Sequence, residues 1–390
     1  MNTPLHLPLL RQSPSLKGKR VLLRLDLNLP FDQGGVTDAF RLDRVAKTLS
    51  FLQENGAKTL VVGHLENKDT TTPESLWPVF DVFRLRVSAV FVKNFEEAKQ
   101  VLDTCAEGSF VMLENIRTWQ GEKKNDPDFS KQLASLVDIY VNDAFSVSHR
   151  EHASIIGVAS LLPHYAGFLL EEEVVALSRS FTPAHPALVI LGGSKFETKM
   201  PLVKRFIDIA DKVVLCGALS NDIYKLRGYE TGTSLVSRKS LDLRGIADNP
   251  KLYVPVDVTA LVGEEVVGKA VDSLEATERI VDIGTESLND LREEIKKAAF
   301  VLWNGPLGEY ENGFDKGTIA IAQMIAESDA ESIIGGGDSL VLISKLRLIE
   351  RFSFVSTGGG AMLEFLTDGT LPGIEALLPP SVIPVETGIQ

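Results

Sequence analysis

The sequence predicts an α/β protein with two doubly wound parallel-sheet (Rossmann-like) lobes, joined by a helix and with a cleft between them. Its 390 residues are enough for two domains of ordinary size. Short, continuous apolar runs alternate with helical patterns, which is typical of parallel strands buried on both faces. The runs form two sets, one on each side of a helical stretch at 167–181.

Five strands are predicted for the first lobe, expected over residues 1–166. They are VLLRLDL (21–27), TLVVGHL (59–65), AVFV (89–92), FVMLEN (110–115) and DIYVNDAF (138–145). The stretch 167–181 then places apolar residues at roughly helical spacing and ends just before two X-Pro pairs. This pattern predicts a connecting helix, with Glu171 to Glu173 on a solvated face.

Six strands are predicted for the second lobe, expected over residues 182–366. They are ALVILGG (187–193), KVVLCGAL (212–219), KLYVPVDV (251–258), AFVLWNG (299–305), SIIGGGD (332–338) and FSFVSTGGG (352–360). The segment EEVVGKAV (264–271) alternates in polarity and predicts a surface hairpin. Beyond Leu378 the chain has no period, so we expect a loose tail.

Composition excludes several classes of protein. A net charge of −13 argues against nucleic acid or an anionic membrane surface as the main partner. No apolar run approaches the roughly 18 residues of a membrane span. Cys105 and Cys216 lie far apart in apolar runs, which predicts two buried thiols in a reducing compartment. We therefore expect a cytoplasmic protein.

Cationic side chains gather at the strand ends of the first lobe, and ligands of open parallel sheets bind at that edge. The residues concerned are Arg24, Arg41, His64, Arg117, His149, Arg150 and His152. Arginine binds carboxylate and phosphate through two parallel bonds, so the set predicts a small ligand that carries both groups. Each arginine alone is more often a surface cation. Asp26 and Asn28 either bind ligand hydroxyls or cap the following turn.

Features typical of phosphate sites follow the strands of the second lobe. The stretch at 352–366 predicts a strand, three glycines and a helix, so backbone N–H groups and a helix N-terminus face one loop. Lys195 and Lys199 are four residues apart after a Gly-Gly turn. Asp338 stands where a helix begins, either as its cap or as a Mg²⁺ ligand. Glu311 is a candidate for ribose hydroxyls.

Other nucleotide and catalytic motifs are absent from the sequence. It contains no GxxxxGK[ST] loop and no GxGxxG followed by an acidic residue about 20 positions later. It also contains no Ser-His-Asp or HExxH pattern. These absences argue against a Walker-type site, a dinucleotide dehydrogenase and a hydrolase.

From about residue 16 to 378 the chain resembles the phosphoglycerate kinase family. The stretches that carry the resemblance are RLDLNLP (24–30), MLENIRTWQGEKKND (112–126), YVNDAFSVSHREH (140–152), LGGSKFETK (191–199), WNGPLGEYE (303–311), GGGDS (335–339), STGGGAMLE (356–364) and LPGIEAL (371–377). The resemblance implies reversible phosphoryl transfer between 1,3-bisphosphoglycerate and MgADP, giving 3-phosphoglycerate and MgATP. It also implies a monomer whose C-terminal segment, 367–390, packs back on the first lobe.

The resemblance assigns roles residue by residue. It implies that Arg41, Lys195, Lys199 and Gly359 are catalytic. It implies that the glycerate ligand is bound by Asp26, Leu27, Asn28, Arg41, His64, Asn67, Arg117 and Arg150. It implies that the nucleotide is bound by Gly193, Lys199, Glu311, Gly336, Gly337, Asp338 and Ser339, with Mg²⁺ at Asp338.

The chain departs from the family pattern after its second strand. Where the family has SHLGRP, this sequence reads Gly63-His64-Leu65-Glu66-Asn67-Lys68. Asn67 replaces a substrate-binding arginine and Glu66 adds a carboxylate, so we expect weakened glycerate binding. An alternative is a degenerate relative that binds nucleotide as a non-catalytic regulatory module. Four retained residues argue against that alternative: Arg41, Lys195, Lys199 and Asp338.

Overall fold

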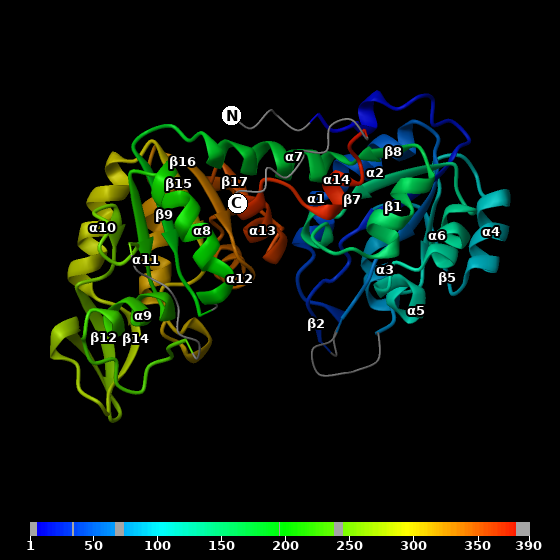
Figure 1. Ribbon diagram of the computed structural model, residues 1–390. Coiled ribbons are helices and arrows are strands. Elements are labelled where there is room, and N and C mark those ends of the chain that lie inside the picture. Colours follow the sequence, from blue (N-terminus) through cyan, green and yellow to red (C-terminus); the bar gives the residue numbers. More distant parts are fainter. Residues whose placement is uncertain (1–5, 33–34, 67–73, 195, 238–244, 380–390) are drawn as a thin grey trace. The chain divides into compact units, whose positions relative to one another are not determined.

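The computed structural model describes residues 6–32, 35–66, 74–194, 196–237 and 245–379, apart from the side chains of Asp32 and Asp338. Two of the candidate site residues, Asn67 and Lys195, lie outside the described residues. The chain divides into two compact units (Figure 1). Unit 1 comprises Met1–Val175 and Asp368–Gln390, and unit 2 comprises Ala176–Thr367.

Unit 1 is built on a six-stranded parallel sheet, in the order β5-β6-β4-β1-β7-β8. The strands are β1 (Arg20–Leu25), β4 (Lys58–Val62), β5 (Ala89–Val92), β6 (Phe110–Leu113), β7 (Ile139–Asp143) and β8 (His164–Ala166). Five of these were predicted, although most end earlier than their apolar runs. The sixth, β8, was missed because its three residues, HYA, are too short and too exposed to form an apolar run.

Side-chain caps begin two of the helices of unit 1, α4 (Phe95–Thr104) and α6 (Pro127–Ala134). Its other helices include α1 (Phe40–Arg44), α2 (Ala46–Glu54), α3 (Trp77–Phe83) and α5 (Gln120–Lys123). Asn94 caps α4 by accepting a hydrogen bond from the backbone N–H of Glu97. Asp126 caps α6 in the same way, with Pro127 at the first helical position. A small antiparallel pair, β2 (Phe31–Asp32) and β3 (Gly35–Val36), lies between β1 and α1.

Unit 2 has a second six-stranded parallel sheet, in the doubly wound order β11-β10-β9-β15-β16-β17. The strands are β9 (Ala187–Leu191), β10 (Lys212–Leu215), β11 (Leu252–Tyr253), β15 (Phe300–Asn304), β16 (Glu331–Gly335) and β17 (Phe354–Val355). Its helices are α8 (Phe196–Ile209), α9 (Ala218–Leu226), α10 (Thr285–Lys297), α11 (Lys316–Ala326), α12 (Gly337–Lys345) and α13 (Gly360–Asp368). The two parallel sheets confirm the predicted fold class.

A separate antiparallel sheet in unit 2 corrects the predicted hairpin at 264–271. That segment is a single strand, β13 (Glu265–Ala270), which pairs with β12 (Asp257–Val262). A third strand, β14 (Arg279–Ile283), pairs with the other side of β12. The alternation reflects one exposed face of this sheet. The apolar run at 251–258 likewise divides between two sheets, as β11 and the start of β12.

The predicted connecting helix is α7 (Phe168–Ser178), followed by a 3₁₀ turn at Arg179–Phe181. Its first turn is held by unit 1, since Leu170 N donates to Asp143 Oδ1 at 2.9 Å and Phe168 N donates to Thr48 Oγ1 at 3.1 Å. Burial raises the pKa of Asp143 to about 6.

The expectation of a solvated glutamate face on α7 is wrong. Glu173 is fully buried. Glu171 forms an ion pair with Arg11, and Glu172 lies 3.2 Å from Arg44. The sequence pattern misled because three consecutive residues of a helix point in three different directions.

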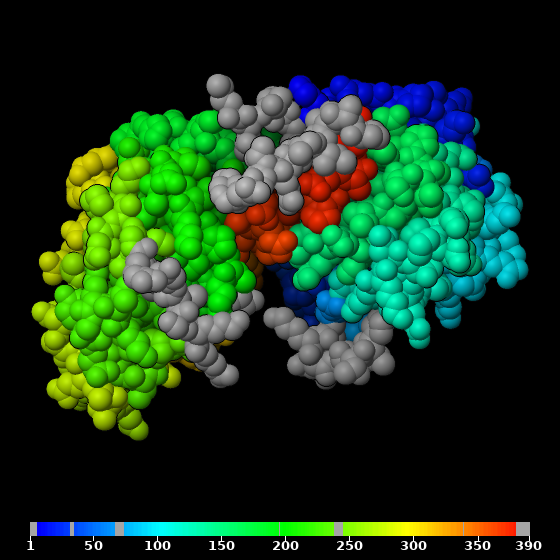
Figure 2. All heavy atoms as spheres, viewed as in Figure 1, coloured from blue at the N-terminus to red at the C-terminus, as the bar shows by residue number. Residues whose placement is uncertain are grey.

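The C-terminal segment of unit 1 contains α14 (Pro372–Glu375) and packs on the loop after β7. Gly373 N donates to Ser148 O at 2.7 Å, and Asn142 Nδ2 donates to Gly373 O at 3.4 Å. A Cβ at Gly373 would lie 2.7 Å from Ile155 Cγ2. Figure 2 shows this red segment against the green residues of unit 1. No helix in the described ranges is long and apolar enough to cross a membrane.

Candidate active site

In unit 1 the strand order reverses between β1 and β7, the position at which doubly wound sheets bind ligands. The loops that follow these two strands are tied together there, because Ser146 Oγ donates to Asp26 Oδ2. Asp26 Oδ1 accepts a hydrogen bond from Asn28 N at 3.0 Å. Asp26 therefore does cap its turn, and its second oxygen holds the neighbouring loop.

Arg41, from α1, lies at this switch point. Its Nη1 donates to Asp26 Oδ2 at 2.9 Å and to Asn28 O at 3.0 Å. The Asn28 side chain in turn accepts a hydrogen bond from Glu66 N at 3.0 Å. Leu27 is fully buried and lies where a Cβ at Gly63 would have to fit. Its predicted substrate contact is therefore restricted to its backbone.

Arg24 is the last residue but one of β1, and its side chain is fully buried. Its Nε donates to Ser154 Oγ at 2.9 Å, and Nη2 lies 3.4 Å from His64 Nδ1. Ser154 Oγ then donates to the buried Glu122 at 2.6 Å. Since arginine only donates, His64 Nδ1 accepts, which leaves the proton of a neutral His64 on Nε2.

Burial and neighbouring cations control the protonation of this cluster. Burial, reinforced by the charges of Arg24 and Arg117, holds the pKa of His64 well below its usual value. Burial and the charge of Arg150 lower the pKa of His149 to about 4. Burial and the charge of Arg117 lower the pKa of His152 to about 4. The histidines are therefore neutral donors near pH 7, and the arginines supply the positive charge.

Arg117 faces the loop after β4, and only 7% of its side chain is exposed. Burial lowers its pKa to about 10, and the Arg24 charge acts in the same direction. Its guanidinium forms an ion pair with Glu66, which also lies 3.4 Å from Lys123 Nζ. The structure thus brings together Asp26, Asn28, Arg41, His64, Arg117 and Arg150, the last through its field at Arg117 and both histidines.

Unit 2 has its switch point between β9 and β15. Gly192 N donates to Asn304 O at 2.9 Å, and Gly193 N donates to Pro306 O at 2.7 Å. A Cβ at Gly192 would lie 2.1 Å from Pro306 O, so only glycine fits between these backbones. At the switch point of unit 2, two backbone segments are therefore hydrogen-bonded directly to each other, whereas in unit 1 the loops are joined through side chains.

Lys199, from α8, is directed into the same junction. Its Nζ donates to Gly192 O, and to Asn304 O at 3.2 Å. The side chain is 6% exposed. The structure thus places the predicted Lys199 beside the predicted Gly193, with its ammonium on backbone carbonyls.

Two glycine loops of unit 2 lead into helices of nine residues each. Gly336, with φ +107°, precedes α12, and Gly359, with φ +53°, precedes α13. A Cβ added at Gly337, Gly359 or Gly360 would touch nothing within 4 Å. Open backbone at a helix N-terminus is what a phosphate needs. Ser339 Oγ is buried and has no hydrogen-bond partner among the described residues.

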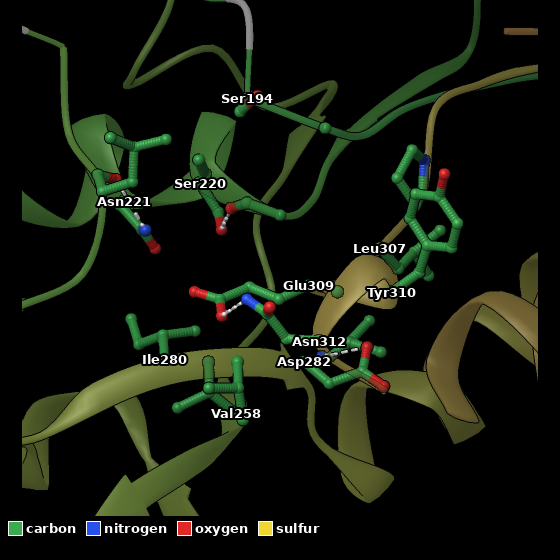
Figure 3. A pocket seen from close by; sticks show the side chains of 18 of the residues that line it. Ser194, Ser220, Asn221, Val258, Ile280, Asp282, Leu307, Glu309, Tyr310 and Asn312 are labelled. Carbon is green, nitrogen blue, oxygen red and sulfur yellow. Dashed lines mark hydrogen bonds between the residues drawn. The ribbon is translucent and has the colours of Figure 1, made fainter. Parts of the chain in front are cut away.

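A cavity of about 300 Å³ opens beside the unit 2 junction (Figure 3). Val258, Ile280 and Leu307 give it apolar walls, and Asn221, Ser220 and Glu309 point into it. Gly193 and Glu311 line it, whereas Gly336, Gly337 and Ser339 are not among its lining residues. Sequence reasoning missed Ser220, Asn221, Val258 and Ile280 because they come from α9 and the antiparallel sheet, whereas Leu307 and Glu309 belong to the stretch 303–311.

Comparison with known proteins gives a consistent result. The family model described as phosphoglycerate kinase matches residues 11–369. A phosphoglycerate kinase of Thermus thermophilus is 40% identical over 93% of this chain and 97% of the relative. One of Leptospira biflexa is 37% identical over 96% and 98%.

Solved structures agree with the sequence comparison. The chain matches phosphoglycerate kinase from Coxiella burnetii with a TM-score of 0.81 and 34% identity, covering 93% of this chain and 96% of that one. It matches the Pyrococcus horikoshii enzyme with a TM-score of 0.83 and 29% identity, covering 95% and 98%.

Proposed function

This chain belongs to the phosphoglycerate kinase family, and from that premise we propose that its two switch points bind the two substrates of the reaction. The reaction is the reversible transfer of a phosphoryl group between 1,3-bisphosphoglycerate and ADP, giving 3-phosphoglycerate and ATP in glycolysis. The observation that carries the assignment is the convergence of Arg41, Arg117 and neutral His64 beside Asp26 in unit 1. Such a cluster fits a ligand with phosphate, carboxylate and hydroxyl groups.

Unit 1 is then the glycerate site. Arg41, Arg117 and Arg150 bind the anionic groups, with His64 donating through Nε2. Asp26 and Asn28 face the hydroxyl, and Leu27 contributes through its backbone. We assign this role to the proposed lobe of residues 1–166 with 367–390. Asn67, outside the described residues, keeps its proposed place at the edge of this site.

Unit 2 is the nucleotide site, in the proposed lobe of residues 182–366. The cavity takes the base and ribose, with Glu311 accepting from a ribose hydroxyl. Gly193, Lys199 and the start of α12 at Gly336, Gly337 and Ser339 face the phosphates, because free N–H groups point outward there.

Mg²⁺ accompanies the nucleotide in this proposal, with Asp338 as its protein ligand. In the described residues, no group of three His, Cys, Asp or Glu side chains is placed to hold a metal ion. A single carboxylate is consistent with Mg²⁺, which usually takes one or two carboxylates together with substrate phosphates and water. When bound, the ion neutralises phosphate charge. The buried hydroxyl of Ser339, next to Asp338, is a further oxygen donor at this helix start.

Catalysis requires positioning and charge neutralisation, with little covalent work by the protein. Arg41 and Lys199 neutralise the oxygens of the phosphoryl group in transit, and Lys195 is assigned the same role. The backbone at Gly359 approaches the group closely because no Cβ intervenes. We further propose that residues 167–181 connect the lobes, and that the protein acts as a monomer in the cytoplasm.

A coupled assay with 3-phosphoglycerate and MgATP, joined to calorimetry, tests these assignments. Arg150→Met should raise the Michaelis constant for 3-phosphoglycerate at least tenfold and leave MgADP affinity unchanged. Glu311→Ala should weaken MgADP by about 1–3 kcal/mol and leave glycerate affinity unchanged. Arg84→Met, at an exposed arginine of unit 1 paired with Asp81, is the control for lost charge. Equal effects of Arg150→Met and Arg84→Met would refute the glycerate assignment.

A further inference from the structure

The carboxylate of Glu66 is paired with Arg117, a cation that the proposed function assigns to substrate binding. Its Oε1 forms an ion pair with Arg117 Nη1 and lies 3.4 Å from Lys123 Nζ. The backbone N–H of Glu66 donates to Asn28 Oδ1 at 3.0 Å, which fixes the residue against a second substrate contact. Glu66 is therefore anchored at the glycerate site through both its backbone and its side chain.

The two partners of this ion pair differ in exposure. The Arg117 side chain is 7% exposed, whereas the Glu66 side chain is 46% exposed. A buried cation without a partner is costly, so Arg117 needs an anion near it. An exposed carboxylate is weakly held because water competes for it. The ion pair therefore neutralises Arg117 in the free protein, while the exposed Glu66 can be displaced by another anion.

We propose that Glu66 is a built-in competitor of the substrate, which takes the place of a substrate anion on Arg117 and thereby sets the affinity for 3-phosphoglycerate. This inference rests on the proposed role of Arg117. Substrate binding becomes an exchange, in which a phosphate or carboxylate oxygen replaces Glu66 Oε1 on the guanidinium.

Lys123 makes that exchange feasible. It is 58% exposed and already lies 3.4 Å from the same carboxylate oxygen. When the substrate takes Arg117, Glu66 keeps a cationic partner and does not face the incoming anion unpaired. The cost of displacement is therefore the loss of one contact, and the free site stays electrically balanced.

Substitution of Glu66 tests the inference directly. Glu66→Gln should lower both the Michaelis constant and the dissociation constant of 3-phosphoglycerate roughly tenfold, about 1.4 kcal/mol. The turnover number and the MgATP constant should not change. Glu107→Gln is the matched control, because Glu107 is 48% exposed, belongs to the same unit and pairs with Lys17 at 3.9 Å. Glu107→Gln removes the same charge, but beside Gly18 and Gly56, which precede β1 and β4. This control should leave the constants for both substrates unchanged.

Salt provides a readout that a merely structural role would not move. Sodium chloride weakens substrate binding but also releases Glu66 from Arg117. The Michaelis constant for 3-phosphoglycerate should therefore rise less steeply with salt in the natural protein than in Glu66→Gln. Equal slopes would overturn the inference.

A double-mutant cycle separates this inference from the proposed function. Arg117→Met should raise the glycerate constant, and Glu66→Gln should then give no further gain. If Arg117→Met raises the constant while Glu66→Gln alone leaves it unchanged or raises it, Glu66 is no competitor and the proposed function stands. If Arg117→Met has no effect, the assignment of Arg117 fails, and the inference fails with it. Glu66 is exposed, so its single variant remains informative even where Arg117→Met does not fold.

Discussion

The two units share one sheet architecture but prepare their switch points by different means. In unit 1, charged side chains from several loops are bonded to one another, as Arg41 is to Asp26 and Arg117 is to Glu66. In unit 2, backbone meets backbone at Gly192 and Pro306, and the buried Lys199 donates to carbonyl oxygens there. In the proposed function, side-chain charge therefore serves one ligand and backbone geometry serves the other.

The difference follows from the charge that each switch point carries in the free protein. A cluster of buried cations is stable only if internal acceptors partner it, and unit 1 supplies Asp26, Glu66 and Glu122. A glycine loop carries no net charge and needs no such partner. Unit 1 therefore depends on electrostatic compensation, whereas unit 2 depends on the absence of side chains.

The largest expected effect concerns Arg41, the cation on which the comparison depends most. Arg41→Met should lower the turnover number by roughly 10³-fold, the low end of the range for an arginine that stabilises a phosphoryl-transfer transition state. Arg41→Lys should recover part of the loss. The coupled assay measures both, with circular dichroism to check folding. A Met variant whose only defect is MgADP affinity would break the division of roles between the units.

Glycine substitutions in unit 2 should have opposite effects at two positions. Gly192→Ala forces a Cβ against Pro306 O and should lower the free energy of unfolding by about 2–4 kcal/mol. Gly360→Ala meets nothing within 4 Å at the start of a helix and should raise it by about 0.5–1 kcal/mol. Denaturant titration measures both changes.

The same Gly360→Ala variant should nevertheless turn over more slowly, because its new methyl group stands next to Gly359, where we propose that the phosphoryl group approaches. A variant that is more stable and equally active would show that this loop serves folding only, and the contrast between the units would lose its basis.

The cavity of unit 2 should distinguish nucleotides by their base. Asn221 Nδ2 donates to Leu235 O at 2.9 Å, while its buried Oδ1 accepts from no described residue. An exocyclic amino group on a purine would satisfy that oxygen. We therefore expect inosine diphosphate, which lacks this group, to bind about tenfold more weakly than ADP, with GDP as a third probe. Isothermal calorimetry measures the three affinities.

Asn221→Leu should abolish this preference. Asn312→Leu should preserve it, because Asn312 lines the same cavity but its amide already donates to Glu309 at 3.0 Å. Equal affinities of the natural protein for ADP and inosine diphosphate would contradict the expectation without any variant.

Acid should change the stability of the two units in different directions, and by less than the substitutions above. His149 and His152 of unit 1 have folded-state pKa values of about 4, below the usual 6.5, so the unfolded chain takes up protons first. Their contribution to stability is complete above pH 6.5 and is lost as the pH falls toward 4. Asp282 of unit 2 has a raised pKa of about 6, caused by burial, and acts in the opposite direction.

Between pH 7 and 5, unit 1 should therefore lose about 1 kcal/mol relative to unit 2, after allowance for solvent screening of the two imidazoles. Asp143, with a pKa of about 6, offsets part of this loss within unit 1. Hydrogen exchange, corrected for intrinsic rates, measures each unit separately. The double variant His149→Gln, His152→Gln should remove part of the difference, because His64, whose pKa burial also lowers, remains. A larger acid loss in unit 2 would contradict the assignment.

Sequence alone predicted the sheets because buried parallel strands must be apolar throughout. It also predicted which residues stand at strand ends, since parallel strands share one carboxyl edge. It did not predict the partners of those residues. Arg24 donates a hydrogen bond to Ser154, 130 positions away in the sequence, and Ser154 donates one to Glu122, 32 positions away. No periodicity encodes such pairs, and the same holds for Glu66 on Arg117.

Unit 1 is discontinuous in sequence, and this has a consequence for how the protein is made. Every residue of unit 2 has been synthesised before α14 is added, so unit 1 lacks this segment until unit 2 has been made. That segment bonds to Ser148 and Asn142, in the stretch that also supplies Ser146 to Asp26. A nascent chain can therefore complete unit 2 before unit 1. A chain that stops before α14 has every residue of unit 2, but the loop after β7 in unit 1 lacks the support of this segment.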